Sequence, residues 1–422
     1  MHYRIFLVDQ LFSIFFQLTL EIAAVLPEKF GIIFDGWDNG HHEHFVAIFA
    51  VFPDSTTTGR SMNILLAMQP LLTPDCQNAV AHADFIVSTL GCYNKSPQNL
   101  LFLVGDNTNT NPAIARILSV TLIGCGSHRL NLGVKRLLLL RETLIEKVHD
   151  LMVRLSSIKN VARLSKLTHL WPEINNQTRW LSTFNMIEKY LKMREVIEKM
   201  EDPDNQIEFA LPTREQQLQI KLLASELNTI RLVTTLMQDA NVDLSKCRFF
   251  FDELRESFAA LDDDLRPNSS HVMNPNFESA IVKIIRGEFG SLSQAESYEA
   301  RIFKKPRTVL IEDAAAGTAS MQPPPTLEER IHNIAAKQPR LNQSGADGEY
   351  IDLTWIPATS DIVERLFSKA KYILTDHRAS MHPKTLESIL MLKENRSLWS
   401  AVLMDRGMRK TADVVGAVDE EA

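Results

Sequence analysis

The first 125 residues alternate between short apolar runs and turn-forming residues. Apolar runs bounded by breaks such as Pro53-Asp54 and Thr58-Gly59 are typical of β-strands joined by turns. Apolar residues at helical spacing predict α-helices, and Pro112 suits a first helical turn. The elements predicted in this way are strands over 30–35, 44–52, 63–68, 100–104 and 122–125, and helices over 79–90 and from 112 onward.

This order of three strands, helix, strand, helix and strand is the order of an RNase H-like domain. Other α/β folds share the alternation, so by itself it indicates only a mixed α/β class. A long helix over 134–155 should follow the last strand. The apolar stretch Phe6 to Leu26 comes before the first strand and is interrupted by Asp9, Gln17 and Glu21. We expect a core-packing helix there rather than a signal peptide or membrane anchor.

From about 171 to 299 the strand signal is absent and the spacing becomes helical. One apolar stripe recurs every three or four residues and predicts a buried helix face. Its members are Met186, Tyr190, Met193, Ile197 and Met200. Thr213 followed by Gln216 indicates a capping box before a further helix, and another helix is predicted over 244–261.

Residues 312–347 contain three consecutive prolines and are rich in Ala, Gly, Gln and Ser, so we expect a flexible linker. Amphipathic helices are predicted after it, over 361–374 and 383–398. The domain division that follows is 1–170 for the first part of an RNase H-like domain, 171–311 for an all-α insertion, 312–349 for the linker, 350–405 for the C-terminal helices and 406–422 for a tail.

Composition indicates a folded protein whose surface is not basic throughout. The chain is 45% hydrophobic and 23% charged, as in ordinary globular proteins. Its net charge of -7 counts against a surface that binds nucleic acid everywhere, although 159–166 and 301–307 are locally basic. The four cysteines form no CxxC pair, so neither a disulfide framework nor a zinc finger is indicated, and no zinc is expected.

Two aspartates stand where predicted strands end. Asp35 follows the first strand in Phe34-Asp35-Gly36-Trp37, and Asp106 follows the fourth in Gly105-Asp106-Asn107. Each alone is a common turn or cap residue. Two such acids on neighbouring strands match what a Mg²⁺ pair requires, because hard cations take oxygen ligands and a metal pair supports in-line phosphoryl displacement. A third carboxylate is then expected.

Five motifs occur in the order and rough spacing found in hAT-superfamily DNA transposases. They are Phe34-Asp35-Gly36-Trp37, Gly105-Asp106-Asn107, Cys125-Gly126-Ser127-His128, Arg179-Trp180 and Glu364-Arg365-Leu366-Phe367-Ser368. The chain therefore resembles this superfamily over positions 35–368. These transposases usually begin with a BED-type zinc finger, which we expect this chain to lack, through loss or truncation.

The resemblance implies that Asp35, Asp106 and Glu364 are catalytic acids that hold Mg²⁺ or Mn²⁺. Without it, Glu364 would be an ordinary solvated helix residue. The resemblance also implies that His128 lies near the scissile phosphate, and a structural histidine is the alternative. Arg179-Trp180 resembles the element that steadies flanking DNA, since an indole beside a guanidinium can stack on an unpaired base. Core packing is the alternative for Trp180.

The C-terminal segment resembles the hAT dimerisation region, which continues through Arg378, Pro383, Asn395 and Trp399. Its two helices carry more apolar side chains than they need to cover themselves, so we expect a homodimer interface. The residues assigned to it are Leu366, Phe367, Ile373, Leu386, Ile389 and Leu390.

The predicted fold is an RNase H-like mixed sheet, interrupted by an all-α insertion, with C-terminal helices that complete the core and the dimer interface. The implied function is Mg²⁺-dependent DNA cleavage and joining in the nucleus, with DNA and a second copy as partners and no membrane. The sequence leaves open a domesticated remnant whose chemistry is idle. A stand-alone nuclease explains less, because it would need neither the dimer segment nor Arg179-Trp180.

Overall fold

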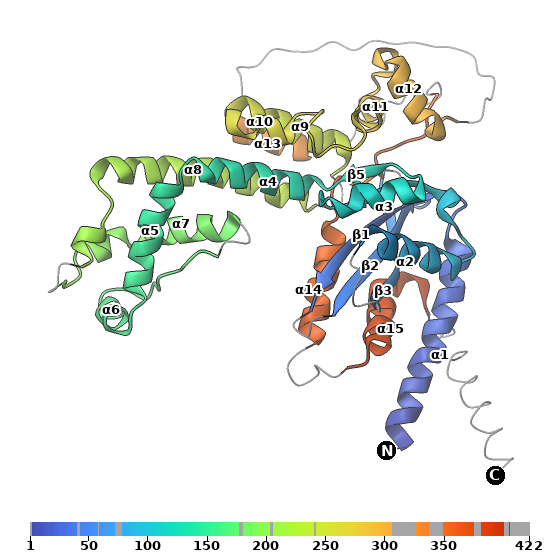
Figure 1. Cartoon of the computed structure of the whole chain (residues 1–422), viewed down its shortest axis with the longest axis horizontal. Helices are drawn as coiled ribbons and strands as arrows, with labels where there is room; N and C mark the ends of the chain where they lie inside the picture. The colour runs from blue at the N-terminus through green and yellow to red at the C-terminus, as the bar shows by residue number, and fades with distance from the viewer. Residues whose placement is uncertain are drawn as a thin grey trace.

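A computed structural model shows the chain as a sheet domain with an arm of helices extending to one side (Figure 1). The structure describes residues 2–39, 43–57, 59–71, 78–176, 180–202, 206–239, 242–305, 326–336, 349–374, 381–400 and 405. The fold is a mixed α/β fold of the RNase H-like class, as predicted.

One five-stranded sheet forms the centre of the domain, in the order β3-β2-β1-β4-β5. Its strands are β1 (Phe30–Asp38), β2 (His44–Pro53), β3 (Ser61–Pro70), β4 (Leu100–Gly105) and β5 (Leu122–Gly124). The first three form an antiparallel meander, and β4 and β5 continue the sheet in parallel beside β1. All five predicted strands are therefore confirmed, with their ends shifted by at most a few residues.

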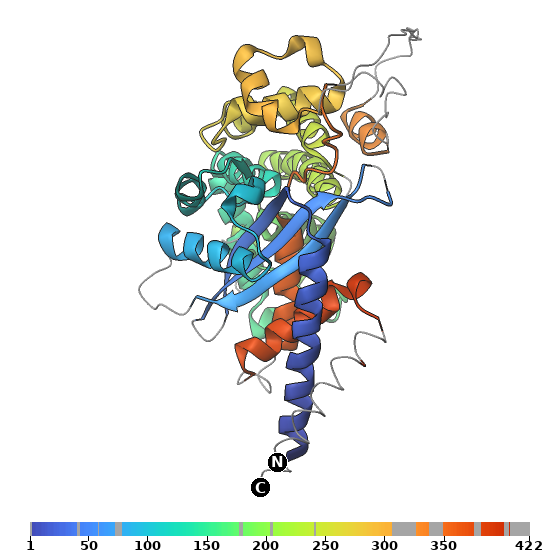
Figure 2. The same cartoon turned by 90° about the vertical axis from the view of Figure 1, so that its right-hand side faces the viewer.

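Helices cover both faces of the sheet (Figures 1 and 2). Helices α2 (Ala79–Gly91) and α3 (Thr110–Leu118) lie on one face, and α14 (Asp361–Ile373) packs on β1 and β2 from the other. Between its two ends, β2 is buried along its whole length. Because both faces are covered, β2 is apolar without alternation, as strands buried on two sides are.

The first helix, α1 (His2–Val25), packs through Leu18 and Ile22 against the domain and contacts α15 (Pro383–Glu394). This confirms the expectation of a core-packing helix. No helix among the described residues is long and apolar enough to cross a membrane.

Helix α15 closes the open edge of the sheet at β3. The Asn395 side chain accepts a hydrogen bond from the Leu65 N–H at 3.0 Å and donates one to the Leu65 carbonyl at 2.9 Å. About two turns earlier, on α15 itself, the Glu387 carboxylate accepts from the Met68 N–H and from the Gln69 amide. These contacts replace a neighbouring strand for backbone groups that would otherwise remain unpaired at the edge.

The helical arm and the region above the sheet contain most of the remaining helices. They are α4 (Gly126–Leu139), α5 (Glu142–Leu155), α6 (Ile158–Leu164), α7 (Trp180–Ile197), α8 (Arg214–Met237), α9 (Leu244–Ser257), α10 (Asp262–Leu265), α11 (Pro275–Arg286), α12 (Gln294–Glu299) and α13 (Leu327–Ala336). The predicted methionine-rich stripe is buried, with its first four members in α7 and Met200 just after it, and the predicted capping box begins α8.

Two helix predictions need correction. The single helix expected over 134–155 is two helices, α4 and α5, which are separated at Leu140 and Arg141. The stretch expected to be a linker contains α13, whose Ile331 is fully buried and whose Arg330 pairs with Glu253 at 2.9 Å. Leu327, Ile334 and Ala335 also pack against the core, so this helix docks through one apolar face and an ion pair.

The residues assigned to a dimer interface are mostly not available for one. Four of the six, Leu366, Phe367, Leu386 and Leu390, are at most 7% exposed because they pack beneath the sheet and around α15. Phe367 stacks on Trp37 with a ring separation of 5.7 Å. Ile373 and Ile389 remain partly exposed. The apolar side chains that the two helices do not need to cover themselves thus cover the sheet of the same chain.

Candidate active site

Asp35 and Asp106 lie beside each other on neighbouring parallel strands. Ile33 in β1 pairs with Val104 in β4; Asp35 lies two residues further along β1, and Asp106 follows directly after the end of β4. Side chains two apart along a strand point to the same face. The register therefore directs both carboxylates to one face at one end of the sheet, as the two strand-end acids predicted.

Glu364 reaches this pair from the first turn of α14, which packs on β1 and β2. The pKa of the Asp35 carboxyl is raised to about 7, first by burial, then by the negative charges of Asp106 and Glu364. The Gly36 N–H donates a hydrogen bond to Asp35 Oδ1 at 2.8 Å. This bond lowers the pKa of Asp35 but offsets only part of the rise. Three acids separated by up to 329 positions thus share one electrostatic environment.

The loop after β4 fixes Asp106 from one side. Asp106 Oδ1 accepts hydrogen bonds from the Thr108 hydroxyl at 2.7 Å and from the Asn111 amide at 2.5 Å. Asn107 donates to the Cys125 carbonyl at 3.1 Å, which ties the ends of β4 and β5 together. The Asp106 carboxylate is therefore held in place by its own strand end before any ligand arrives.

His128 approaches the same acids from the first turn of α4. Its pKa is lowered mainly by burial, while Asp106 raises it and His271 lowers it. His271 belongs to the loop before α11, and its Nε2 lies 2.9 Å from Asp264 Oδ1. These electrostatic effects place His128 close to Asp106 and Glu364.

Sequence reasoning missed two members of this cluster. Asp361 lies one turn before Glu364, is 7% exposed and accepts a hydrogen bond from the Ser127 hydroxyl at 3.0 Å. Burial, followed by the charge of Glu364, raises its pKa. The i, i+3 spacing of Asp361 and Glu364 was a usable signal. No local signal could have placed His271 here, since 143 positions separate it from His128.

The donor set fits a divalent cation in charge and chemistry. Several carboxylates face one another, and their mutual repulsion together with burial raises the pKa values of Asp35 and Asp361. Oxygen donors of this kind suit Mg²⁺ or Mn²⁺. However, no three His, Cys, Asp or Glu side chains in the described part of the chain are grouped tightly enough to hold one ion. The acids would therefore have to draw together around it.

The carboxylate cluster gives a pH-dependent stability difference that can be measured. Asp35→Asn removes a group that is ionised in the unfolded chain above its ordinary pKa of 3.8 but protonated in the folded chain up to about pH 7. The folded state then binds more protons, so the wild-type free energy of unfolding falls as the pH rises from 4 to 7. In metal-free buffer, we expect the variant to be more stable by about 3–4 kcal/mol at pH 8 and equal to wild type near pH 4.

Urea unfolding at several pH values checks this expectation. Asp84→Asn, an exposed change on α2, serves as the matched control and should show no such trend. A stability difference between Asp35→Asn and wild type that stayed constant from pH 4 to pH 8 would mean that Asp35 does not face the other acids.

The structure does not support the indole of Trp180 as part of the predicted DNA-stacking platform at Arg179-Trp180. Trp180 begins α7 and is only 6% exposed, because it packs into the core of the helical arm. A buried ring cannot stack on a base without local unfolding. Arg179 lies outside the described residues. By contrast, Trp171 is 57% exposed.

Trp180→Ala should therefore lower the free energy of unfolding by about 3–5 kcal/mol, the usual cost of removing a buried aromatic ring. Trp171→Ala, at an exposed indole, should change it by less than about 0.5 kcal/mol. Chemical denaturation of the two variants distinguishes a core residue from a surface platform. If the two variants had equal free energies of unfolding, Trp180 would be a surface residue that can stack on a base.

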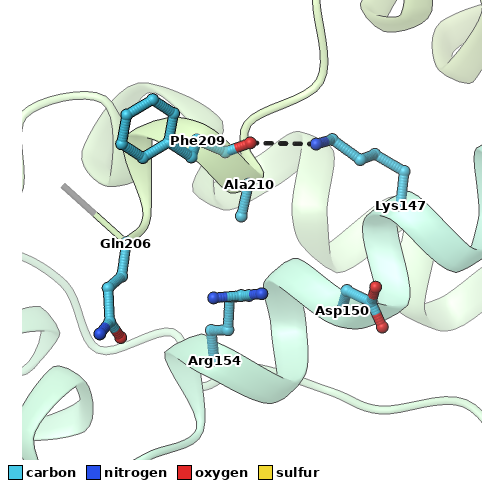
Figure 3. A pocket seen from close by; sticks show the side chains of 6 residues that line it. All are labelled: Lys147, Asp150, Arg154, Gln206, Phe209 and Ala210. Carbon is cyan, nitrogen blue, oxygen red and sulfur yellow. Dashed lines mark hydrogen bonds between the residues drawn. The ribbon is translucent and has the colours of Figure 1, made fainter.

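Figure 3 shows a separate hollow of about 260 Å³ in the helical arm. Lys147 and Arg154 of α5 line one side, and Phe209, whose ring is 80% exposed, lies opposite. Lys147 Nζ donates to the Phe209 carbonyl at 3.1 Å. The hollow involves none of the acids at the end of the sheet, so it is not part of the candidate active site.

Residues 123–225 match the family model of the ZBED1 RNase-like helical domain. Over these residues, the match supports a relationship to hAT-type transposase-related proteins. A search of curated proteins found no match.

The match to the ZBED1 RNase-like helical domain covers about a quarter of the chain, from β5 through α4 to the first half of α8. It includes His128 and Trp180, and it excludes Asp35, Asp106 and Glu364. The relationship to hAT-type proteins therefore rests on the junction of the sheet with the helical arm. The acids are supported by their geometry alone.

Proposed function

We propose that this chain is a hAT-type transposase-derived protein that cleaves and joins DNA strands at the acids Asp35, Asp106 and Glu364. The observation that carries the proposal is their shared electrostatic environment at the end of β1 and β4. Acids that raise the pKa of one of their own members also lower the stability of the fold. Such a cluster is therefore expected where a bound cation neutralises its negative charge.

Each residue has a defined role in this proposal. Asp35 and Asp106 would hold the cation from the sheet, and Glu364 would complete its ligands from α14. When bound, Mg²⁺ or Mn²⁺ would polarise the scissile phosphate and favour ionisation of the attacking water or 3′-hydroxyl. His128, held neutral by burial, would lie beside the phosphate as a hydrogen-bonding group.

DNA in the nucleus and a second copy of the chain are the proposed partners. Dimerisation would use Ile373 and Ile389, the members of the predicted set that are still partly exposed. The net charge of -7 limits DNA binding to local basic surface, such as the side of the helical arm that carries Lys147 and Arg154.

A second candidate is a remnant that keeps the fold without catalysis. The absence of a tight three-ligand group among the described residues favours it. The full chain should be incubated with pre-nicked and branched DNA in Mg²⁺, in Mn²⁺ and in EDTA. Divalent-dependent cleavage supports the enzyme, whereas the absence of cleavage on every branched substrate supports the remnant.

A further inference from the structure

Two histidines face each other on the side of the sheet opposite the acids. His44 begins β2, where it pairs with Asp38 of β1, and His82 lies on α2 above them. Their Nε2 atoms are 3.3 Å apart, and the rings meet edge to face. His82 is 8% exposed and the His44 side chain 16%, so the pair is largely shielded from water.

The second nitrogen of each ring already has an acceptor. His44 Nδ1 lies 2.7 Å from Asp38 Oδ1, and His82 Nδ1 lies 3.3 Å from the Asn78 carbonyl oxygen. A carbonyl or carboxylate oxygen can only accept, so each Nδ1 must carry the hydrogen. Neutral rings with protonated Nδ1 atoms present bare lone pairs at Nε2.

When both rings are neutral, two Nε2 lone pairs meet at 3.3 Å, and a cation that binds both nitrogens from beside the line joining them removes this repulsion. A zinc ion bound tetrahedrally at about 2.0–2.1 Å from each nitrogen would place the two nitrogens about 3.3–3.4 Å apart. The observed separation matches this value. The Asp38–His44 contact also has the form of the carboxylate–histidine–metal arrangement, in which the carboxylate fixes the ring and its tautomer.

We propose that His44 and His82 bind a zinc-class divalent cation through their Nε2 atoms, with Asp38 as the positioning residue for His44. Imidazole ligands favour zinc, copper and nickel over magnesium. Two imidazole ligands leave coordination positions open, which water can occupy. The ion would link α2 to the β1–β2 hairpin.

The backbone beneath the pair is shaped for this position. A Cβ atom on Gly36 would lie 2.8 Å from both Cε1 and Nε2 of His44. The His44 ring therefore rests directly on the strand, and a larger residue at position 36 would require the ring to shift. The expectation that the chain binds no zinc rested on cysteine spacing, and cysteines take no part in this pair.

Zinc alone, titrated into the metal-free full chain against a chromophoric chelator, tests the proposal. The wild-type chain should bind zinc with a rise in melting temperature, and His82→Gln should bind one equivalent less. His332→Gln, at an exposed histidine on α13, is the matched control and should keep it. Asp35→Asn should also keep it, which separates this site from the acids of the proposed function.

Asp38→Asn gives a variant that should fold normally, since the Asp38 side chain is 69% exposed. Its zinc affinity should fall about 10–100-fold, the usual effect of removing a carboxylate behind a ligating histidine. Co²⁺ in place of zinc should give a tetrahedral absorption spectrum that His82→Gln abolishes. Equal zinc binding by wild type and His82→Gln, or no binding by either, would overturn the proposal and leave a pair that shares a proton.

Discussion

Asp35→Asn is expected to abolish divalent-dependent DNA cleavage by the full chain, a loss greater than about 10²–10³-fold. The amide keeps the shape of the side chain and can still accept from the Gly36 N–H, but it removes the charge that would hold a cation against its hydration shell. Because the change also relieves repulsion among the acids, the variant should fold at least as well as wild type above pH 7.

The cleavage assay should use branched DNA with Mn²⁺ and quantify product against time. Asp84→Asn, which removes an exposed carboxylate on α2, should retain wild-type rates. If Asp35→Asn cleaved as fast as wild type, the three acids would not be the catalytic centre, even if the protein proved to be a nuclease.

Asn395→Ala should destabilise the fold by about 2–6 kcal/mol. The substitution leaves both the N–H and the carbonyl of Leu65 without partners in a site where Leu65 is fully buried, and each unpaired group costs about 1–3 kcal/mol. Ser397→Ala, at an exposed position two residues further on, should change stability by less than about 0.5 kcal/mol.

Equilibrium denaturation of both variants in the same buffer gives this comparison. A loss below 1 kcal/mol for Asn395→Ala would indicate that water or another side chain replaces the amide at the sheet edge. The hAT resemblance had included Asn395 in a dimerisation segment. A large loss of stability in a monomeric sample would instead mean that Asn395 acts mainly by pairing the backbone at the edge of the sheet.

The strands and the first two acids could be predicted because their signals are local. Apolar runs bounded by turn residues mark β1 to β5, and an acid at the end of such a run needs no knowledge of distant contacts. Asp35 and Asp106 then meet because parallel neighbouring strands end at the same edge. Glu364 has no comparable local signal and depended on the family resemblance.

The errors share a physical cause, which is burial by distant parts of the chain. Trp180, Phe367 and Leu390 each present an apolar side chain that local spacing cannot assign to a core or to a surface. The helix α13 lies inside an expected linker because its apolar residues, with Ile331 at the centre, dock on helices far away in the sequence. The break between α4 and α5 could not be predicted because both helices carry apolar residues at the same helical spacing.

The closure of β3 by Asn395 has a consequence for synthesis. The Leu65 backbone leaves the ribosome 330 residues before the side chain that caps it. At about 5–20 residues per second, the edge strand must wait roughly 15–65 s on the nascent chain. During that interval it can pair with the same strand of a neighbouring nascent chain, so co-translational chaperone binding at residues 61–70 should govern yield more than the stability of the finished fold does.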